Sequence, residues 1–409
     1  MHVRYPIGLR RLATPGADSI ALLFAIESFT RALLASVIPL QAYALVDDAQ
    51  SYSALFFVVS VIGLVGGLMV PRLVRLTARR WVYTAGAVLL VGASALLAEG
   101  TLNAQAAGMA CRVLGVVAMT ICINLYIMDV IARQDVTRAE PKRLFYSAGA
   151  WTAGPALGVY LGTAVADWVP YAVSGGCGLV TLGYFWLLRM KENPTFSRPA
   201  KRIPSPRANI RRFFAQPRLV LAWTISTGRN SWWVMFFNFA PIYALELGYS
   251  EMASGLIVSV GSSFLFLMPL WGWCMRRFGV RRILLTGFGF AAVVTVGAAL
   301  AAGLPAVAVA CLLLGAFGMV LLDVVGNIPF LLAVRSHERP EMTSVYATYR
   351  DAADLAPPGV FTLLLKFFEL PAVFVAGGVA MLGVAALSRR MHPRFAMYRP
   401  ARQASPSAA

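Results

Sequence analysis

Long apolar runs, each about as long as a membrane-spanning helix, alternate with short polar segments along this chain. A helix needs about 20 apolar residues to cross a bilayer. The runs are continuous, which argues against the alternating strands of a membrane barrel. Twelve runs are found, at residues 19–45, 52–74, 81–99, 104–131, 144–166, 168–189, 217–246, 252–275, 282–302, 305–334, 343–367 and 370–388. We therefore predict an all-α integral membrane protein with twelve transmembrane helices.

Composition and charge support this interpretation. Of the 409 residues, 59% are hydrophobic and only 13% are charged, whereas soluble domains carry about 25% charged residues. The net charge of +18 does not indicate nucleic-acid binding, because the basic residues lie in clusters between apolar runs and no stripe of base-stacking aromatics accompanies them.

The positions of lysine and arginine predict the orientation. By our count, 31 of the 36 lie in the N-terminal segment, in every second loop and in the C-terminal tail, whereas Lys366 is the single one on the opposite face. Basic loops stay cytoplasmic, so both termini are expected in the cytoplasm. The excess of arginine over lysine is typical of a GC-rich bacterial genome and suggests the bacterial inner membrane.

A long loop divides the chain into two halves. Residues 190–216 are basic and rich in proline, which predicts a cytoplasmic linker. It separates an N-terminal six-helix bundle, 1–189, from a C-terminal six-helix bundle, 217–391. The tail, 392–409, ends in Ser, Pro and Ala and is expected to be disordered.

The two halves repeat each other at a nearly constant offset. The sequence from Gly154 to Gly158 aligns with residues 355–359, and Pro39 aligns with Pro241. We infer a duplicated six-helix unit, as expected when two pseudo-symmetric bundles rock around a site at their interface.

This architecture resembles the major facilitator superfamily (MFS), and a loop motif strengthens the likeness. The loop between spans 8 and 9 reads Gly-Trp-Cys-Met-Arg-Arg-Phe-Gly-Val-Arg-Arg and is similar to the superfamily's loop pattern; the loop between spans 2 and 3 carries a poorer copy. The usual aspartate is replaced by Pro71 and Arg276. The resemblance implies gating roles, with Asp129 as a possible substitute carboxylate; the alternative is that the arginines only set topology. The residues concerned are Arg72, Arg75, Asp129, Gly272, Arg277, Gly279 and Arg281.

A second motif lies in span 5. It reads Gly-Ala-Trp-Thr-Ala-Gly-Pro-Ala-Leu-Gly and ends in Gly154, Pro155 and Gly158. It is similar to the Gly-Pro pattern of the superfamily's proton-coupled antiporters. Glycines let helices approach closely and proline bends them, so a kinked packing helix without bearing on direction is the alternative.

Eight ionisable residues lie well inside the predicted spans, away from their ends. A charge at mid-bilayer costs about 2.5–3.5 kcal/mol even on a lenient scale, so such residues pair or face a cavity. Four are acids and four are arginines, which favours pairing. They are Glu27, Arg31, Arg112, Arg229, Asp323, Arg350, Asp351 and Asp354.

The resemblance implies that spans 1, 4, 7 and 10 line a central cavity, so the first five of these residues, and Asn230, are expected to reach it. Arg112 resembles a buried arginine associated with proton transfer. We predict that Glu27 pairs with Arg229 or with Arg31, and that the pair breaks when the carboxylate takes a proton. The alternative is a permanent pair that fixes helix register. The three charges of span 11 are expected to act in gating or packing.

Aromatic and amide side chains are candidates for the cavity wall, although in membrane helices they more often pack or face lipid. The candidates are Tyr43, Trp232, Trp233, Phe236, Phe237, Phe239, Asn124 and Asn238.

The sequence predicts a transporter and not an enzyme. It shows no metal-ligand cluster, no paired catalytic residues and no phosphate-binding Gly-Lys motif, so no metal, cofactor or ATP is expected. We predict a monomeric, proton-coupled exporter of a small organic or drug-like molecule, with the substrate, protons and the lipid bilayer as its partners. The alternatives are uptake of an organic anion such as a siderophore or carboxylate and, more remotely, a membrane-embedded enzyme or a non-transporting receptor.

Overall fold

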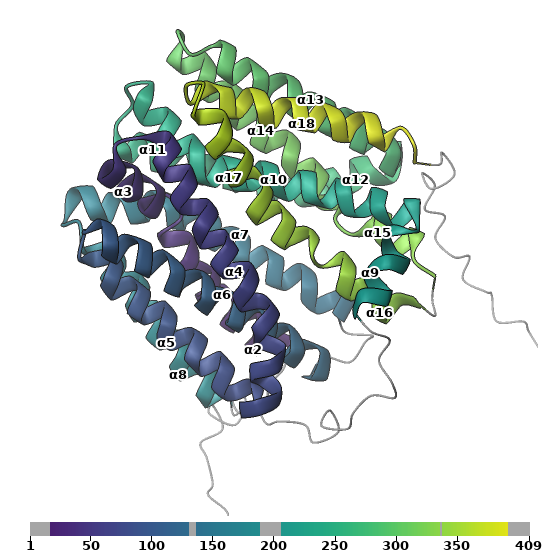
Figure 1. Ribbon diagram of the computed structural model, residues 1–409, viewed down its shortest axis with the longest axis horizontal. Helices are drawn as coiled ribbons and strands as arrows, with labels where there is room; N and C mark the ends of the chain where they lie inside the picture. The colour runs from purple at the N-terminus through teal and green to yellow at the C-terminus, as the bar shows by residue number, and fades with distance from the viewer. Residues whose placement is uncertain (1–16, 131–135, 189–205, 336–337, 392–409) are drawn as a thin grey trace, which may run out of the picture.

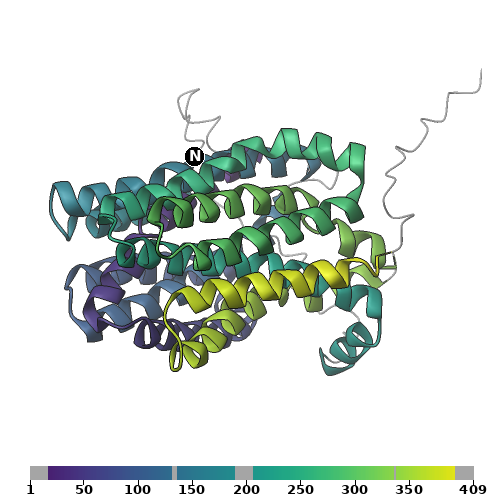
Figure 2. The same ribbon diagram turned by 90° about the horizontal axis from the view of Figure 1, so that it is seen from above.

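The computed structural model describes residues 17–130, 136–188, 206–335 and 338–391. Within these ranges every regular element is a helix. Figure 1 shows two bundles, one drawn in purple and blue and the other in teal to yellow, and Figure 2 shows their helices running roughly parallel.

A helix, or a consecutive series of helices, covers each of the twelve predicted runs. The N-terminal half contains α2 (Ala17–Leu33), α3 (Val37–Val46), α4 (Ala49–Thr77), α5 (Arg79–Ala98), α6 (Leu102–Val130), α7 (Val136–Ala164) and α8 (Val169–Leu187). The C-terminal half contains α9 (Pro206–Phe214), α10 (Pro217–Glu246), α11 (Glu251–Ser263), η2 (Phe264–Leu267), α12 (Met268–Phe278), α13 (Val280–Leu300), α14 (Pro305–Val325), α15 (Ile328–Ala333), α16 (Arg339–Tyr346), α17 (Tyr349–Leu365) and α18 (Pro371–Ser388).

Eight stretches of the described chain are long and apolar enough to cross a membrane. They are Ala21–Val46, Ala49–Thr77, Arg79–Ala98, Leu102–Tyr126, Glu251–Phe278, Val280–Leu300, Pro305–Ala333 and Pro371–Ser388. The membrane crossings of α7, α8, α10 and α16–α17 therefore remain predictions. Many apolar side chains are exposed, among them Leu76, Leu187 and Val293, and a surface of this kind suits contact with lipid.

Four of the predicted spans are interrupted helices and not the continuous ones that the sequence suggested. The breaks lie between α2 and α3, around η2, between α14 and α15, and between α16 and α17. In the first, the amide of Ala35 donates to Ala32 at 3.1 Å and therefore not to Arg31, the usual α-helical partner. In the third, Gly326 adopts a φ of 49°, in the left-handed region that glycine tolerates.

The predicted linker and tail fall largely outside the described residues. The linker is described from Pro206 onward, where it forms α9. Phe213 of α9 is buried against the ends of α10, α15 and α16, and Arg212 pairs with Glu338 at 2.7 Å. The described part of the linker therefore belongs structurally to the C-terminal half. Residues 392–409 lie outside the described chain.

The two halves meet through α7 with α11 and through α4 with α17. We call the side where α8 ends and α10 begins the linker side, and the opposite side the far side. The hydrogen bonds between the halves join Tyr43 to Glu246, Tyr52 to Asn238, Ser53 to Pro358 and Thr362, and Ala156 to Ser259. In the described chain these bonds all lie toward the far side, and α4 and α17 diverge toward the linker side (Figure 1). The structure is thus closed on the far side.

Candidate functional site

A buried ion pair links two helices of the C-terminal half. The Nε atom of Arg229 in α10 lies 3.4 Å from Oδ1 of Asp323 in α14. The indole Nε1 of Trp233 donates to Oδ2 of the same carboxylate at 3.0 Å. Arg229 and Trp233 are four residues apart and therefore share one face of α10. The side chains of Arg229 and Asp323 are 10% and 18% exposed, so the pair is enclosed but not sealed.

A helix break and a polar network lie beside this pair. The left-handed Gly326 follows Asp323 by three residues, and a β-carbon added there would lie 4.0 Å from Nη1 of Arg229. The hydroxyl of Tyr346 hydrogen-bonds to Ser226 at 2.6 Å and donates to the side chain of Asn327 at 3.2 Å. These bonds connect α10, the α14–α15 break and α16, so the pair lies where three segments of the half meet.

The acidic residue of the N-terminal half has a more enclosed setting. Glu27 is 1% exposed, and its Oε1 lies 3.8 Å from Nη2 of Arg31, four residues along α2. The hydroxyl of Tyr83 in α5 is within electrostatic range of both, and Tyr83 packs with Leu23 in the apolar interior of this half. Two partners were predicted for Glu27, and the structure shows it beside one of them, Arg31. Arg229 pairs instead with Asp323, which sequence reasoning did not propose.

Arg112 binds the broken first span. Its Nη2 donates to the backbone carbonyl of Arg31 at 2.8 Å, the carbonyl that the turn after Leu33 leaves without Ala35 as partner. A buried carbonyl without a hydrogen bond is costly, so Arg112 stabilises the break. The structure thus shows Arg112 as a hydrogen-bond partner of α2, and the part in proton transfer that the resemblance implies stays a prediction.

The Gly-Pro motif of α7 packs against the same break. A β-carbon on Gly158 would lie 1.8 Å from the carbonyl oxygen of Leu33, and one on Gly154 would lie 2.7 Å from the carbonyl carbon of Ala32. Both neighbours are backbone atoms, which cannot move aside as a side chain can. The two glycines therefore permit a backbone-to-backbone crossing of α7 and α2.

Two of the candidate aromatics reach the interface between the halves. Trp233 stacks on Phe237 at 5.5 Å between ring centroids, and Phe237 contacts Trp151 of α7 at 4.9 Å. Sequence reasoning did not name Trp151 as a contact, although it lies in the motif of span 5 one turn before Pro155. The sequence contained a usable indication, because Trp151 is four residues before Pro155 and therefore lies on the same face of the helix as the motif.

The other candidate aromatics have different surroundings. Trp232 is 1% exposed and donates to Thr295 at 2.9 Å, while Phe236 and Phe239 are fully buried in the large core cluster. These three pack inside the protein and do not form an open wall. Tyr43, on the far side, donates to Glu246 at 3.0 Å.

The three amide candidates form no hydrogen bond with either ion pair within the described chain. Asn238 accepts a hydrogen bond from Tyr52 of the other half at 3.0 Å, so it contributes to the closed far side. Asn124 and Asn230 are partly buried.

The charges of span 11 lie near the start of α17. Arg350, Asp351 and Asp354 are all exposed. Arg350 donates from Nε to the hydroxyl of Tyr349 at 3.2 Å and lies over the same ring. Within the described chain Arg350 forms no ion pair with Asp354, despite their spacing of four residues.

The loop motifs adopt matching turns in the two halves. Gly279, between α12 and α13, has a φ of 81°, and Ala78, between α4 and α5, has a φ of 96°. Arg72, Arg75 and Arg277 are exposed, whereas Arg281 and Gly272 are partly buried. The side chain of Asp129 lies outside the described residues, so its predicted contact with the first loop stays a prediction.

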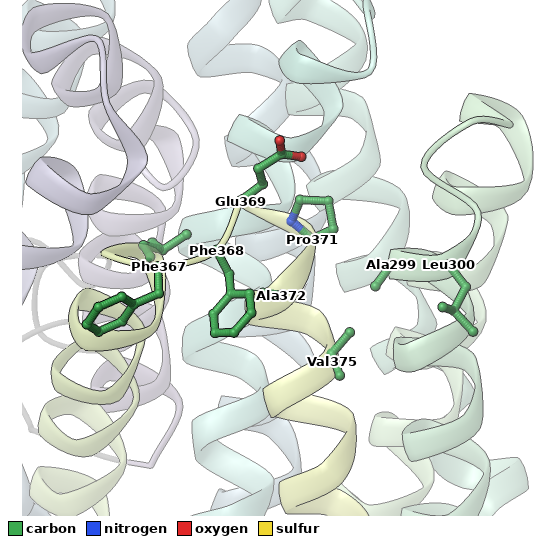
Figure 3. Close-up of a pocket in the computed structure, with 9 residues that line it drawn as sticks. Ala299, Leu300, Phe367, Phe368, Glu369, Pro371, Ala372 and Val375 are labelled. Carbon is green, nitrogen blue, oxygen red and sulfur yellow. The ribbon is translucent and has the colours of Figure 1, made fainter.

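A shallow apolar pocket opens elsewhere, at the far ends of α13, α17 and α18 (Figure 3). It is lined by Ala299, Leu300, Leu365, Phe367, Phe368, Glu369, Pro371, Ala372 and Val375. None of the predicted site residues lines it. Among the described residues no group of three or more His, Cys, Asp or Glu side chains could hold a metal ion.

Comparisons with known proteins define the family. The model of the Major Facilitator Superfamily matches residues 20–358. No curated protein matches the chain.

Solved structures share the fold at low sequence identity. A POT family transporter in complex with 5-aminolevulinic acid aligns with a TM-score of 0.73 and 13% identity over 93% of this chain and 96% of that one. A peptide transporter POT in complex with sulfate gives a TM-score of 0.73 and 14% identity over 96% and 99%. A nucleoside transporter gives a TM-score of 0.69 and 13% identity over 90% and 99%. The chain belongs to the Major Facilitator Superfamily and is a membrane transporter of that type.

Proposed function

We propose that this transporter exports a small organic, drug-like molecule across a bacterial inner membrane in exchange for protons. The observation that carries the proposal is the carboxylate of Asp323, which is shared between Arg229 and Trp233 and remains partly accessible. A carboxylate in this position exists in two states: ionised and paired with the arginine, or protonated and released from it.

Coupling follows from competition at this carboxylate. Removing one partner of a buried ion pair leaves an uncompensated charge, which is strongly unfavourable. A proton on Asp323 therefore frees Arg229 for other contacts, whereas loss of the proton restores the pair. Arg229 and Asp323 belong to different helices, α10 and α14. The protonated state and the paired state of Asp323 therefore favour different arrangements of the C-terminal half.

Alternating access is supported by the position of the contacts between the halves. The hydrogen bonds of Ser53 with Pro358 and of Ala156 with Ser259 both lie toward the far side. With the linker side in the cytoplasm, as the basic loops predict, the structure is closed to the outside. The opposite state requires these far-side bonds to break and new contacts to form on the linker side.

Export is proposed over import because the Gly-Pro motif of α7 is similar to that of proton-coupled antiporters. The close crossing of Gly154 and Gly158 over the broken first span fits this motif and fits a packing helix equally, so the vesicle experiment below decides the direction. The second candidate is uptake of an organic anion, which the four arginines within the predicted spans favour. A membrane-embedded enzyme or non-transporting receptor is the remote alternative.

The test uses everted membrane vesicles from a strain whose chromosomal copy of the gene is deleted and which expresses the transporter from a plasmid. After respiration acidifies the vesicle interior, a panel of aromatic cations, neutral drugs and carboxylates is added and the pH gradient is followed with a fluorescent weak base. We expect at least one compound to collapse the gradient with the wild type. The variant Asp323→Asn should abolish the response, and Asp167→Asn, at an exposed acid outside the site, should leave it intact.

Three outcomes would contradict the proposal. Retained gradient collapse in Asp323→Asn would remove this carboxylate from coupling. Movement of substrate with no proton flux would exclude proton coupling. Accumulation of carboxylates driven by an external acid pH would favour the uptake alternative.

A further inference from the structure

We propose that the groove at the far ends of α13, α17 and α18 binds a zwitterionic phospholipid whose headgroup carries a primary ammonium. The lipid belongs to the leaflet on the far side of the membrane, with an acyl chain on the apolar wall of the groove and the headgroup at its rim. This site is separate from the ion pairs on which the proposed function rests. The proposal is carried by the shape and lining of the groove and by two charges at its rim.

The groove has the size of a ligand site. Its volume is about 580 Å³, within the range of about 300–1,000 Å³ that is typical of ligand pockets. Three helix ends form it: Ala299 and Leu300 of α13, Leu365 of α17, and the turn that leads into α18 with the first residues of that helix. The groove is shallow and open along one side, as a lipid that enters from the bilayer requires.

The lining is apolar and faces outward. Leu300, Phe367 and Phe368 are 80%, 75% and 63% exposed, and exposed apolar surface of this kind marks contact with lipid or with an apolar ligand. Val375 continues the wall along α18 (Figure 3). Because α13 and α18 are both long and apolar enough to cross a membrane, this wall extends from their ends toward the hydrocarbon layer, where an acyl chain lies.

The polar end of the groove lies at the opposite end from Val375. Among the lining residues of the described chain only Glu369 is charged. Figure 3 shows its carboxylate pointing beyond the start of α18, whereas the ring of Phe368 lies alongside that helix. Lys366 is three residues earlier in the chain, and its Nζ lies 6.0 Å from the centroid of the Phe367 ring. The groove therefore has an apolar wall and two opposite charges at one end, as a zwitterionic phospholipid does.

The two rim charges are available to a ligand. Lys366 and Glu369 are both exposed, and neither forms an ion pair or a side-chain hydrogen bond within the part of the chain that the structure describes. A zwitterionic headgroup contacts both of them. Its ammonium donates charge-assisted hydrogen bonds to the carboxylate of Glu369, and its phosphate lies near the ammonium of Lys366.

The other charges of the far side favour this headgroup over an anionic one. Glu246 is within electrostatic range of Glu369, and Asp47 and Asp48 of the other half gather with Glu246 around one tyrosine hydroxyl. By our count, Lys366 is the single cation that the predicted topology places on this side. A negative field attracts an ammonium and repels an anionic headgroup, so the carboxylate of Glu369 is expected to select the lipid.

The experiment measures lipid binding to the purified full-length protein by native mass spectrometry. After delipidation in detergent, the protein is titrated with three lipids that have identical acyl chains: phosphatidylethanolamine, phosphatidylcholine and phosphatidylglycerol. We expect the Kd of phosphatidylethanolamine to be lower than that of the other two by about fivefold, the factor that one hydrogen bond contributes. Glu369→Gln should remove this preference. Glu99→Gln, at an exposed acid at the far end of α5, should keep it.

A second pair of variants tests the position of the lipid without changing a charge. Val375→Trp fills the groove, whereas Val379→Trp places the same side chain one turn further along α18, at an exposed position outside the groove. Val375→Trp should raise the Kd of phosphatidylethanolamine by a similar factor, and Val379→Trp should leave it unchanged. The proposal is overturned if either of the other lipids binds as tightly as phosphatidylethanolamine, if Glu369→Gln keeps the preference, or if the two tryptophan variants bind the lipid equally well.

Discussion

Within the described chain, each half of this transporter holds one acid–arginine pair inside its predicted membrane spans, and the two pairs differ in what they connect. Glu27 and Arg31 are neighbours on one helix, 3.8 Å apart, with the carboxylate 1% exposed. Asp323 and Arg229 come from two helices, 3.4 Å apart, with the carboxylate 18% exposed. The same two chemical groups thus form a local contact in one half and a link between helices in the other.

Under the proposed function, burial of a charge is therefore not enough to identify a coupling site. Two residues on one helix move together. Protonation of the acid in such a pair is therefore expected to have little effect on how the helices are arranged. A pair between α10 and α14 holds two segments together and beside Gly326, where the backbone is already broken. We therefore expect mutations in the N-terminal half to act on stability and mutations in the C-terminal half to act on coupling.

The largest effect on stability is expected at Gly158. Gly158→Ala would place its β-carbon 1.8 Å from the carbonyl oxygen of Leu33, which forces α7 away from the span that carries Glu27 and Arg31. We expect a loss of more than ~3 kcal/mol, at or above the usual cost of overpacking, or failure to fold. Thermal unfolding in detergent measures it.

The same helix supplies the control. Gly149→Ala meets no atom within 4 Å and should keep the wild-type unfolding temperature. At the repeat-equivalent Gly359 the added carbon would meet the ring of Phe57 of the other half at 2.9 Å, and a ring can rotate, so Gly359→Ala should cost less. Equal losses at 158 and 149 would contradict the backbone crossing.

The next prediction distinguishes the role of Glu27 from that of Asp323. Glu27→Gln removes the charge beside Arg31, which is itself 19% exposed and can therefore be partly solvated. We expect a loss of about 2 kcal/mol, below the 3–5 kcal/mol typical of fully buried pairs, with proton-coupled transport per folded molecule retained. If Glu27→Gln instead abolished gradient collapse in everted vesicles while Asp323→Asn did not, the roles assigned to the halves would have to be exchanged.

The sequence predicts the architecture well because hydrophobic length is a local property. The twelve apolar runs are helical within the described residues, whereas the division of the halves at residues 190–216 stays a prediction. The breaks within spans were not predictable, because the first one depends on Arg112, 81 residues away, reaching the carbonyl of Arg31. No local pattern around residues 34–36 contains that information.

For the site, the sequence identifies the ionisable residues but not all of their partners. The spacing of four between Glu27 and Arg31 is visible in the sequence, and the structure forms that pair. The pairing of Arg229 with Asp323 depends on how α10 is rotated against α14, and neither residue spacing nor the repeat contains that information. Trp151 was missed for a similar reason: its partner Phe237 belongs to the other half.

A smaller effect is expected at the far-side hydrogen bonds between the halves, which must break when the transporter opens to the other side. Ser259→Ala removes the hydroxyl that accepts from the amide of Ala156 at 2.8 Å. A hydrogen bond contributes about 1 kcal/mol net, so the far side should open about five times more often. The reporter is a cysteine at the buried position Val159 in an otherwise cysteine-free background. It should react faster with an impermeant thiol reagent when Ser259→Ala is present than when Ser259 is retained. Ser263→Ala, whose hydroxyl bonds within its own turn, should leave the rate unchanged.

The smallest effect compares the two halves at equivalent turns. Ala78 has a φ of 96° and Gly279 a φ of 81°, and alanine is strained in this region whereas glycine is not. Ala78→Gly should therefore raise the free energy of unfolding, by about 1 kcal/mol, since the relief of strain exceeds the added flexibility of the unfolded chain. Gly279→Ala should lower it by a similar amount. Thermal unfolding of the two single variants and the double variant measures both changes. A destabilised Ala78→Gly would show that this turn is held by its side chain and not by its backbone, and that the loops of the two halves are not equivalent.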